Sequence, residues 1–349
     1  MPQLQGVGLG ETTSELRRRV SPLALALMVL VISAAGTALA RAYALHRRLV
    51  DEPGERRSHI VATPRGGGAG PVLATLLGAG VLASQGANAG STVLASAGLL
   101  AVAAIGAWDD HRPLSARLRL AVHVVAGLML GFAMFDPVAM PVHFIATAAL
   151  AVVLVNVWNF MDGIDGIAAS QALLVAAAAL VVGGGIGGSI AVPVAAACAG
   201  FLPFNLPRAR IFLGDVGSGA LGFAMAWITA SVAARSAIAG ALMLLPLSAF
   251  LVDAGMTLTR RIVRRERWWE AHAQHLYQAL ARRYGHGPVT AGYAFVTLAA
   301  SAVAMLNPSR QPTVTMASVA VWYTGAAVSW LFAQRWIAQR ASSGITEKD

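Results

Sequence analysis

Apolar segments as long as a lipid bilayer is thick recur along this chain, and they constrain its fold more than any other feature. A segment of about 20 apolar residues crosses the hydrocarbon core as one α-helix. The 349 residues are 57% hydrophobic and 12% charged, with a mean hydropathy of +0.65, which excludes an ordinary soluble enzyme. Because backbone polar groups inside a bilayer must pair within their own segment, the sequence predicts an all-α polytopic integral membrane protein with ten or eleven transmembrane helices.

The predicted spans are separated by short polar or glycine-rich connections. Eleven of them cover residues 22–45, 69–86, 91–108, 118–135, 141–159, 167–186, 189–206, 217–234, 237–259, 288–306 and 313–338. We expect residues 1–21 and 341–349 to be terminal tails and residues 22–340 to form a single transmembrane domain. The first span is too long for a cleavable signal peptide, and the lone Cys198 excludes a disulfide framework and a cysteine-based metal site.

Basic residues gather on one side of the predicted spans. Of the 26 basic residues, 20 lie in alternate connections or at the C-terminal end, although Arg17, Arg18 and Arg19 precede the first span on the other side. The positive-inside rule then places the connections at about 46–68, 109–117, 160–166, 207–216 and 260–287 in the cytoplasm. The net charge of +10 suits anionic lipid or phosphate rather than nucleic acid.

The connection after the fifth span carries polar residues in a regular pattern. Asn156, Asn159, Asp162 and Asp165 recur every three residues, and glycines follow each of the two aspartates. Carboxylates and amides at the end of a membrane-length segment are costly unless they have a function. The alternative for this stretch alone is a polar turn between two helices.

Two other connections on the basic side carry acidic residues. Asp109 and Asp110 end the third span, where adjacent carboxylates could hold Mg²⁺ through substrate phosphates or act as a base. Asp215 lies between glycines just before a span, so it could face a metal-bound phosphate near a helix N-terminus, and Phe212 could stack on a base. The alternatives are a solvated turn for the first pair and a plain connector for the second segment.

The remaining basic connections favour phosphate binding. The segment from Arg56 to Gly68 combines Arg57, His59 and Arg65 with a glycine run, whose backbone N–H groups could approach a phosphate. His272 and His275 are three residues apart and would share a helix face, where they could contact a diphosphate; as a zinc site the pair is weak. The alternatives are an ordinary positive-inside loop and an interfacial amphipathic helix.

Four motifs together resemble one known family. They are Trp108-Asp109-Asp110, the stretch from Asn156 to Gly166, the stretch from Phe204 to Ser218, and the loop from Ala271 to Gln278. In this order they resemble the polyprenyl-phosphate N-acetylhexosamine-1-phosphate transferases, also called glycosyltransferase family 4. The last loop resembles the branch that initiates O-antigen and related surface glycans, because the adjacent histidines of the peptidoglycan enzyme are missing. The basic residue that usually follows the aspartate pair is not obvious here, and Arg112 could replace it.

The resemblance implies a reaction, a location and partners. The 22–340 domain would transfer N-acetylhexosamine 1-phosphate from a UDP-sugar of the GlcNAc, FucNAc or QuiNAc type to undecaprenyl phosphate, releasing UMP. It would use Mg²⁺, for which Mn²⁺ could substitute, and would initiate O-antigen, lipopolysaccharide or other cell-envelope glycan synthesis. The protein would be a multi-pass protein of the bacterial plasma membrane among membrane lipids, with its site facing the cytoplasm. A homodimer is left open.

The resemblance also assigns roles to residues. Asp215, with Asp109 and Asp110, would hold the metal, and either of that pair could orient or deprotonate the lipid phosphate. The other catalytic positions would be Asp165, His272 and His275. The substrate would be bound by Arg57, His59, Asn159, Asp162, Asn205 and Phe212. A membrane transporter using the same acidic residues is the alternative, although transporters usually place such charges near the midplane of broken helices.

Overall fold

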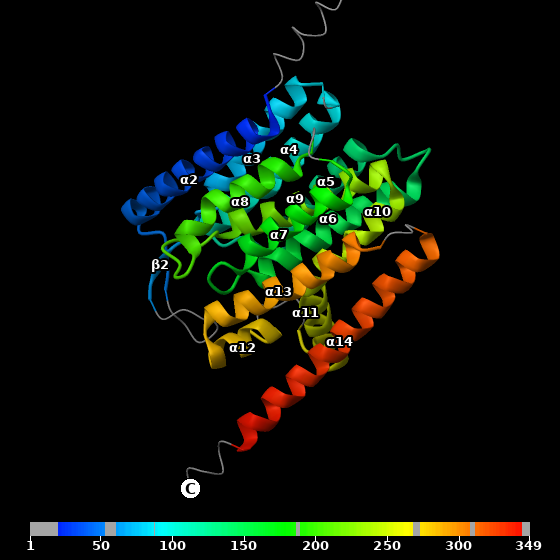
Figure 1. Ribbon diagram of the computed structural model, residues 1–349. Coiled ribbons are helices and arrows are strands. Elements are labelled where there is room, and N and C mark those ends of the chain that lie inside the picture. Colours follow the sequence, from blue (N-terminus) through cyan, green and yellow to red (C-terminus); the bar gives the residue numbers. More distant parts are fainter. Residues whose placement is uncertain are drawn as a thin grey trace, which may run out of the picture.

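The computed structural model describes residues 20–52, 61–86, 88–185, 189–267, 273–307 and 311–343. The described chain is a bundle of helices with one two-stranded sheet (Figure 1). The apolar helices are α2 (Pro22–Arg47), α3 (Ala69–Ser84), α4 (Ala89–His111), α5 (Ala116–Met134), α6 (Pro141–Met161), α7 (Ile167–Val182), α8 (Ala191–Asn205), α9 (Asp215–Arg235), α10 (Ala237–Leu242), α11 (Leu244–Val263), α13 (His286–Met305) and α14 (Pro312–Ser343).

Every predicted span coincides with a helix of this bundle. Within the described ranges, eight helices are long and apolar enough to cross a membrane, with α10 and α11 counted together as one stretch of 27 residues. The helices α3, α7 and α8 are apolar but shorter, with 16, 16 and 15 residues. The all-α polytopic class is therefore confirmed. The span predicted at 237–259 differs in one respect, because the chain forms two helices there that meet at Met243.

The helix α9 lies at the centre of the bundle. In its most apolar window 89% of the residues are buried inside the protein, against 6% for α14, which lies at the edge (Figure 1). Glycines allow its neighbours to approach closely. A Cβ atom on Gly106 of α4 would lie 2.3 Å from the carbonyl oxygen of Asp215, and one on Gly222 would lie 2.2 Å from that of Leu154 in α6. The start of α9 is thus fixed against the end of α4.

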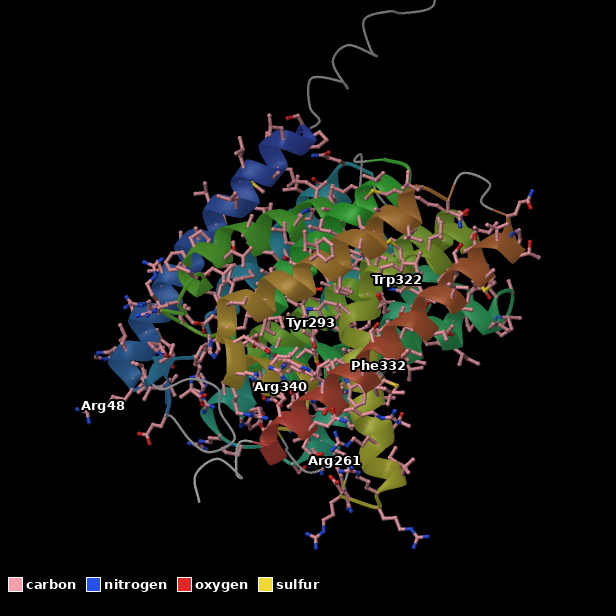
Figure 2. All side chains as sticks on the ribbon, turned by 60° about the horizontal axis from the view of Figure 1, so that its bottom comes forward. Arg48, Arg261, Tyr293, Trp322, Phe332 and Arg340 are labelled. Carbon is pink, nitrogen blue, oxygen red and sulfur yellow. The ribbon has the colours of Figure 1, made fainter. Side chains whose placement is uncertain are left out.

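Irregular segments gather at one end of the bundle. Figure 1 shows β2 (Thr63–Pro64), α12 (Leu276–Tyr284) and the C-terminal end of α14 at this end, and α10 at the other. β1 (Val50–Asp51) pairs antiparallel with β2, Val50 opposite Pro64. Figure 2, which turns this end toward the viewer, shows Arg48, Arg261 and Arg340 on it. We call it the loop end.

The glycine run after β2 packs against the chain rather than against a ligand. The N–H groups of Gly67 and Gly68 donate to the carbonyl oxygens of Phe212 and Leu213, each at 2.9 Å. A Cβ atom on Gly68 would lie 2.2 Å from the Cα atom of Gly217. The prediction that this run offers its N–H groups to a phosphate is therefore wrong for these two glycines, whose donors are already used.

Candidate active site

Two cavities distinguish the two ends of the bundle. The larger, about 330 Å³, lies away from the loop end and is lined by Trp227, Arg235 and several serines; among the residues described there, no carboxylate lines it. The smaller, about 200 Å³, lies at the loop end. It is lined by Asp51, Arg65, Asp110, Asn159, Asp162, Gly163, Ile164, Asn205, Phe212, Gly214, Asp215, Ser218 and Gln278. Because the sequence places its acidic motifs here, the smaller cavity is the candidate site.

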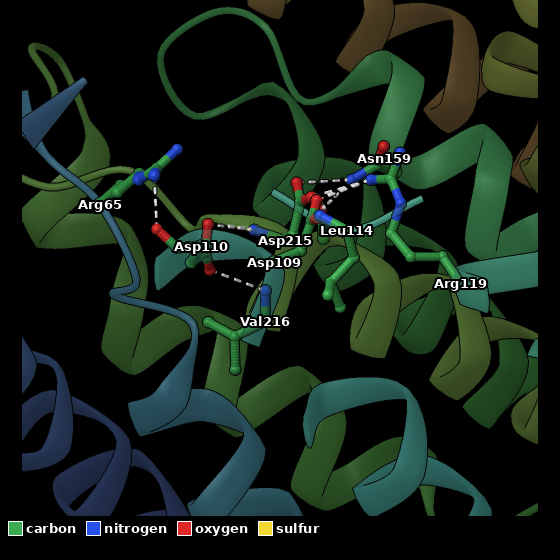
Figure 3. Close-up of polar contacts among 9 residues, drawn as sticks. Arg65, Asp109, Asp110, Leu114, Arg119, Asn159, Asp215 and Val216 are labelled. Carbon is green, nitrogen blue, oxygen red and sulfur yellow. Dashed lines mark hydrogen bonds and ion pairs between the residues drawn. The ribbon is translucent and has the colours of Figure 1, made fainter. Parts of the chain in front are cut away.

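Asp110 caps the start of α9 from the end of α4. Its Oδ1 accepts a hydrogen bond from the N–H of Asp215, and its Oδ2 accepts one from the N–H of Val216, each at 3.1 Å (Figure 3). The side chain is 5% exposed. These N–H groups have no partner within their own helix, and the helix dipole favours an anion beside them. Gly214 bends the chain into this contact with a φ of 71°.

Arg119 joins two carboxylates at the wall of the site. Its Nη1 donates to Asp109 Oδ2 at 2.9 Å and to Asp215 Oδ2 at 3.2 Å (Figure 3). On the other side of Asp215, Asn159 Nδ2 donates to Asp215 Oδ1 at 2.9 Å and to Ser218 Oγ at 3.1 Å. Asp215 is therefore oriented from α5 and α6 together.

Asp162 differs from the other acids of the cavity. It directly follows α6 and is half-buried, and no hydrogen bond to its carboxylate occurs among the described residues. Loss of hydration, followed by repulsion from Asp215 and Asp110, raises the pKa of Asp162 to about 8. The cavity thus holds more carboxyl groups than its own cations can balance if all are ionised.

This surplus of carboxyl groups is relevant to the predicted magnesium ion, which carboxylate oxygens could bind. Within the described ranges, no three carboxylate, imidazole or thiol groups form a ready-made metal cage. Mg²⁺ commonly takes only one or two carboxylates and completes its shell with water and substrate phosphate oxygens. The carboxylate of Asp215 fits that pattern. The ligand roles of Asp109 and Asp110 stay predictions; their oxygens accept hydrogen bonds from Arg119 and from the start of α9.

Arg65, Phe212 and Asn205 complete the cavity wall. Arg65 Nη2 donates to the carbonyl oxygen of Asp110, while its Nε is buried with no partner in the described structure. Such a donor suits an anionic ligand. Phe212 is half-buried and lines the cavity, as a ring that stacks on a base would. Asn205 accepts from the N–H of Gly166 at 2.8 Å and donates to the carbonyl oxygen of Ile211 at 2.9 Å, so it holds two loops together.

Several predicted site residues are not brought into this cavity. Asp165 lies beside it, with its Oδ2 3.2 Å from His286 Nδ1 at the start of α13. His275 is 3% exposed, caps α12 and stacks on Phe160 and Tyr277. Neither side chain lines the cavity. Their catalytic roles remain predictions. The predictions for Arg57, His59 and His272 fall outside the described residues.

Sequence reasoning missed other residues of the site. Arg119, and not Arg112, is the cation beside the aspartate pair; Arg112 is exposed at the end of α4. The connection from α4 to α5 is short, so the first turn of α5 runs back past the last turn of α4. A short connection between two predicted helices indicates that they run antiparallel, and this pattern could have identified Arg119 from the sequence. Gln278 lines the cavity from α12, a helix that hydropathy alone did not separate from its loop.

Comparisons with known proteins agree with the motifs. A family model for glycosyl transferase family 4 matches residues 92–233, which contain Asp110, Asp162 and Asp215 of the cavity. A phospho-N-acetylmuramoyl-pentapeptide-transferase of Moorella thermoacetica is 33% identical over 238 residues, 59% of this chain and 74% of that protein. An undecaprenyl-phosphate alpha-N-acetylglucosaminyl 1-phosphate transferase of Yersinia pestis is 28% identical over 306 residues, 80% of this chain and 81% of that protein.

Mycobacterial proteins show the same similarity over less of their length. A decaprenyl-phosphate N-acetylglucosaminephosphotransferase of Mycobacterium tuberculosis strain H37Rv is 35% identical over 207 residues, which is 50% of this chain and 51% of that protein. The counterpart of Mycolicibacterium smegmatis is 34% identical over 231 residues, 55% of each chain. This chain therefore spans about half the length of the mycobacterial relatives that it matches.

Proposed function

The chain belongs to glycosyl transferase family 4, and from this premise we propose that it transfers an N-acetylhexosamine 1-phosphate from a UDP-sugar to undecaprenyl phosphate and releases UMP. One observation carries the proposal. Asp110, Asp162 and Asp215 face one cavity at helix ends, and Arg65 lines the cavity beside them. The relatives named above act on polyprenyl phosphates or on a muramoyl-pentapeptide, which supports a phosphosugar transfer.

The proposed reaction is a displacement at phosphorus. An oxygen of the lipid phosphate attacks the β-phosphorus of the UDP-sugar, and a new P–O bond forms. The bond from the β-phosphorus to the bridging oxygen breaks, and its electron pair leaves with UMP. Three phosphoryl groups must approach one another in this step. Mg²⁺, when bound at Asp215, supplies positive charge that offsets their repulsion, and Arg65 and Arg119 add to that charge.

Some carboxylates of the site position other groups, and one of them accepts a proton. Asp110 fixes the start of α9, and Asp109 orients Arg119, so both act through other groups. Asp162 has no hydrogen-bond partner among the described residues, and its raised pKa makes its ionised form a stronger proton acceptor than an ordinary aspartate. We assign to Asp162 the proton of the attacking lipid phosphate. Asn159 and Phe212 would hold the uridine and its diphosphate.

The sugar of the donor would be recognised by a residue of α12. Gln278 is the residue of α12 that lines the cavity, and its side-chain oxygen accepts from the N–H of His275 at 3.3 Å. Changing Gln278 to Ala should shift the preference among UDP-GlcNAc, UDP-FucNAc and UDP-QuiNAc while UMP inhibition is retained. Loss of UMP inhibition with unchanged donor preference would contradict this assignment.

The loop end would face the cytoplasm, because it carries most of the arginines. In a Cys198→Ala background, Arg112→Cys marks the loop end, and Val138→Cys marks the connection after α5, where Val138 is 89% exposed. An impermeant maleimide applied to intact cells should label Val138→Cys alone, and Arg112→Cys only after permeabilisation. The reverse pattern would invert the topology.

Transfer of labelled sugar 1-phosphate to undecaprenyl phosphate, across a panel of UDP-sugars, tests the proposal. We expect a lipid-linked product and one UMP for each transfer with at least one N-acetylhexosamine donor. A protein that binds these donors without forming lipid product would favour the transporter alternative. The position of the acids at helix ends, rather than at mid-helix, argues against that alternative.

A further inference from the structure

Asp253 joins four helices through one buried carboxylate. It belongs to α11 and is 2% exposed. The carboxylate accepts hydrogen bonds from the N–H groups of Leu276 (2.9 Å) and Tyr277 (3.1 Å) in α12, from Tyr293 Oη in α13 (2.7 Å), from Trp330 Nε1 in α14 (2.9 Å) and from Thr257 Oγ1 in its own helix (3.3 Å). Figure 2 shows Tyr293 on α13, together with Trp322 and Phe332 of the neighbouring α14.

The helix α12 depends on this carboxylate. It has nine residues, too few to be a stable helix on its own in water. Its first N–H groups have no partner within the helix, and the Asp253 oxygens satisfy two of them. A charged acceptor at a helix N-terminus also gains from the helix dipole. The contact therefore decides where α12 begins.

From α12 the contacts continue into the candidate active site. Tyr277 Oη donates to the carbonyl oxygen of Phe160 at 3.0 Å, two residues before Asp162. A Cβ atom on Gly163 would lie 2.2 Å from the same Oη, so the turn that carries Asp162 fits closely around this hydroxyl. The next residue, Gln278, lines the cavity.

We infer that Asp253 is a positioning residue for the transfer reaction: by fixing α12 it sets the turn of Asp162 and the place of Gln278. The inference rests on the proposed function. It differs from a purely structural role in a measurable way. If Asp253 only stabilised the fold, its loss would reduce the amount of folded protein, while each folded molecule would keep its kcat and KM.

A cysteine reporter separates these two roles. Ala281 of α12 is 6% exposed, and the native Cys198 is buried and can be replaced by alanine. In the full-length Cys198→Ala, Ala281→Cys protein, maleimide should label α12 slowly. Adding Asp253→Asn puts an N–H₂ group against the donors, so labelling should become about tenfold faster or more. The kcat of the folded fraction should fall by a similar factor.

Two further variants keep the test decisive. Tyr277→Phe removes only the hydroxyl that reaches Phe160, so kcat should fall by less than in Asp253→Asn and labelling should change little. Asp136→Asn is the matched control, because Asp136 accepts two backbone N–H groups in the exposed turn between α5 and α6. It should leave kcat and labelling unchanged.

The outcomes distinguish the inference from the proposed function. Labelling of Asp253→Asn at the parent rate, or fast labelling with parent kcat and KM, would overturn the positioning role. Where Asp253→Asn does not fold, Tyr277→Phe with parent kcat and KM would overturn it. Absence of transfer by the wild-type protein would instead refute the proposed function, while the labelling rates would still report whether Asp253 docks α12.

Discussion

Two buried aspartates hold helix N-termini in this protein, but only one of them lies at a cavity with unpaired groups. Asp110 accepts two N–H groups at the start of α9, and Asp253 accepts two at the start of α12. Around Asp253, side chains from three helices complete the hydrogen bonding of the carboxylate. Around Asp110, three more carboxylates line the same cavity of about 200 Å³, and Asp162 is left without a hydrogen-bond partner in the described chain.

The difference shows what marks a reactive site. Burial and capping of a helix occur at both places and indicate only that each carboxylate fixes a helix. Like charges that are held together, with the Nε of Arg65 unpaired among the described residues, cost free energy in the absence of a ligand. Under the proposed function, the binding of phosphates and a cation would offset that cost. The surroundings of Asp253 have no such requirement.

The largest effect should come from Asp162. Changing Asp162 to Asn removes the proposed proton acceptor, so transfer should fall by about 100-fold or more. Folding stability should stay equal or rise, because repulsion from Asp215 and Asp110 is relieved. Transfer rates and thermal midpoints of purified protein check both parts. A lower midpoint with parent transfer would show that Asp162 only stabilises the fold.

Arg119 tests the link between the aspartates of the site. Changing Arg119 to Ala leaves Asp109 and Asp215 without their shared cation, and transfer should fall by about tenfold. The loss should be smaller than for a fully buried ion pair, because the Arg119 side chain is 32% exposed and solvent screens its charge. The control is Arg112→Ala, an exposed arginine of the same connection, which should keep parent activity. Equal losses in the two variants would mean that general basic charge, not the bridge, is required.

Gly163 connects the two regions directly. An alanine there would place its Cβ 2.2 Å from Tyr277 Oη, so α12 or the turn must move, at a cost of about 1–3 kcal/mol of stability and several-fold in kcat. Adding Tyr277→Phe should restore part of the stability and part of kcat, since the nearest remaining atom, Cζ of the ring, is 3.1 Å from that Cβ. Gly255→Ala in α11 meets nothing within 4 Å and should be neutral or slightly stabilising. Absence of rescue would show that the hydroxyl is not the obstacle.

The smallest effect concerns pH. Burial lowers the pKa of His275 beside α12, so the unfolded state binds more protons than the folded state below the ordinary histidine pKa of about 6.5. This histidine therefore lowers the free energy of unfolding as the pH falls below that value, by at most about 1.4 kcal/mol per pH unit, and has no such effect above it. His275→Asn keeps a residue suited to capping but removes the titration. Its thermal midpoint should depend less on pH between 5 and 7 than that of the parent.

Much of this architecture follows from hydropathy, because long apolar runs can only be helices in a bilayer. The site motifs were also predictable, since their acids stand at the ends of such runs. Asp253 was not predicted, because one carboxylate inside an apolar run gives no periodic signal and its partners lie up to 77 residues away. Arg119 was missed for a related reason: Arg112 is nearer in sequence, but only the reversal of α5 decides which arginine reaches Asp109.

The proposed reaction is tested by measuring transfer by purified wild-type and Asp215→Asn protein, each with Mg²⁺ and with EDTA. UMP and lipid-linked sugar phosphate are counted in the same sample. The proposed reaction predicts equal amounts of both products for the wild type with Mg²⁺, and a loss of about 100-fold or more with EDTA or in Asp215→Asn at an unchanged thermal midpoint. Wild-type turnover by folded Asp215→Asn protein, or transfer that persists in EDTA, would contradict it.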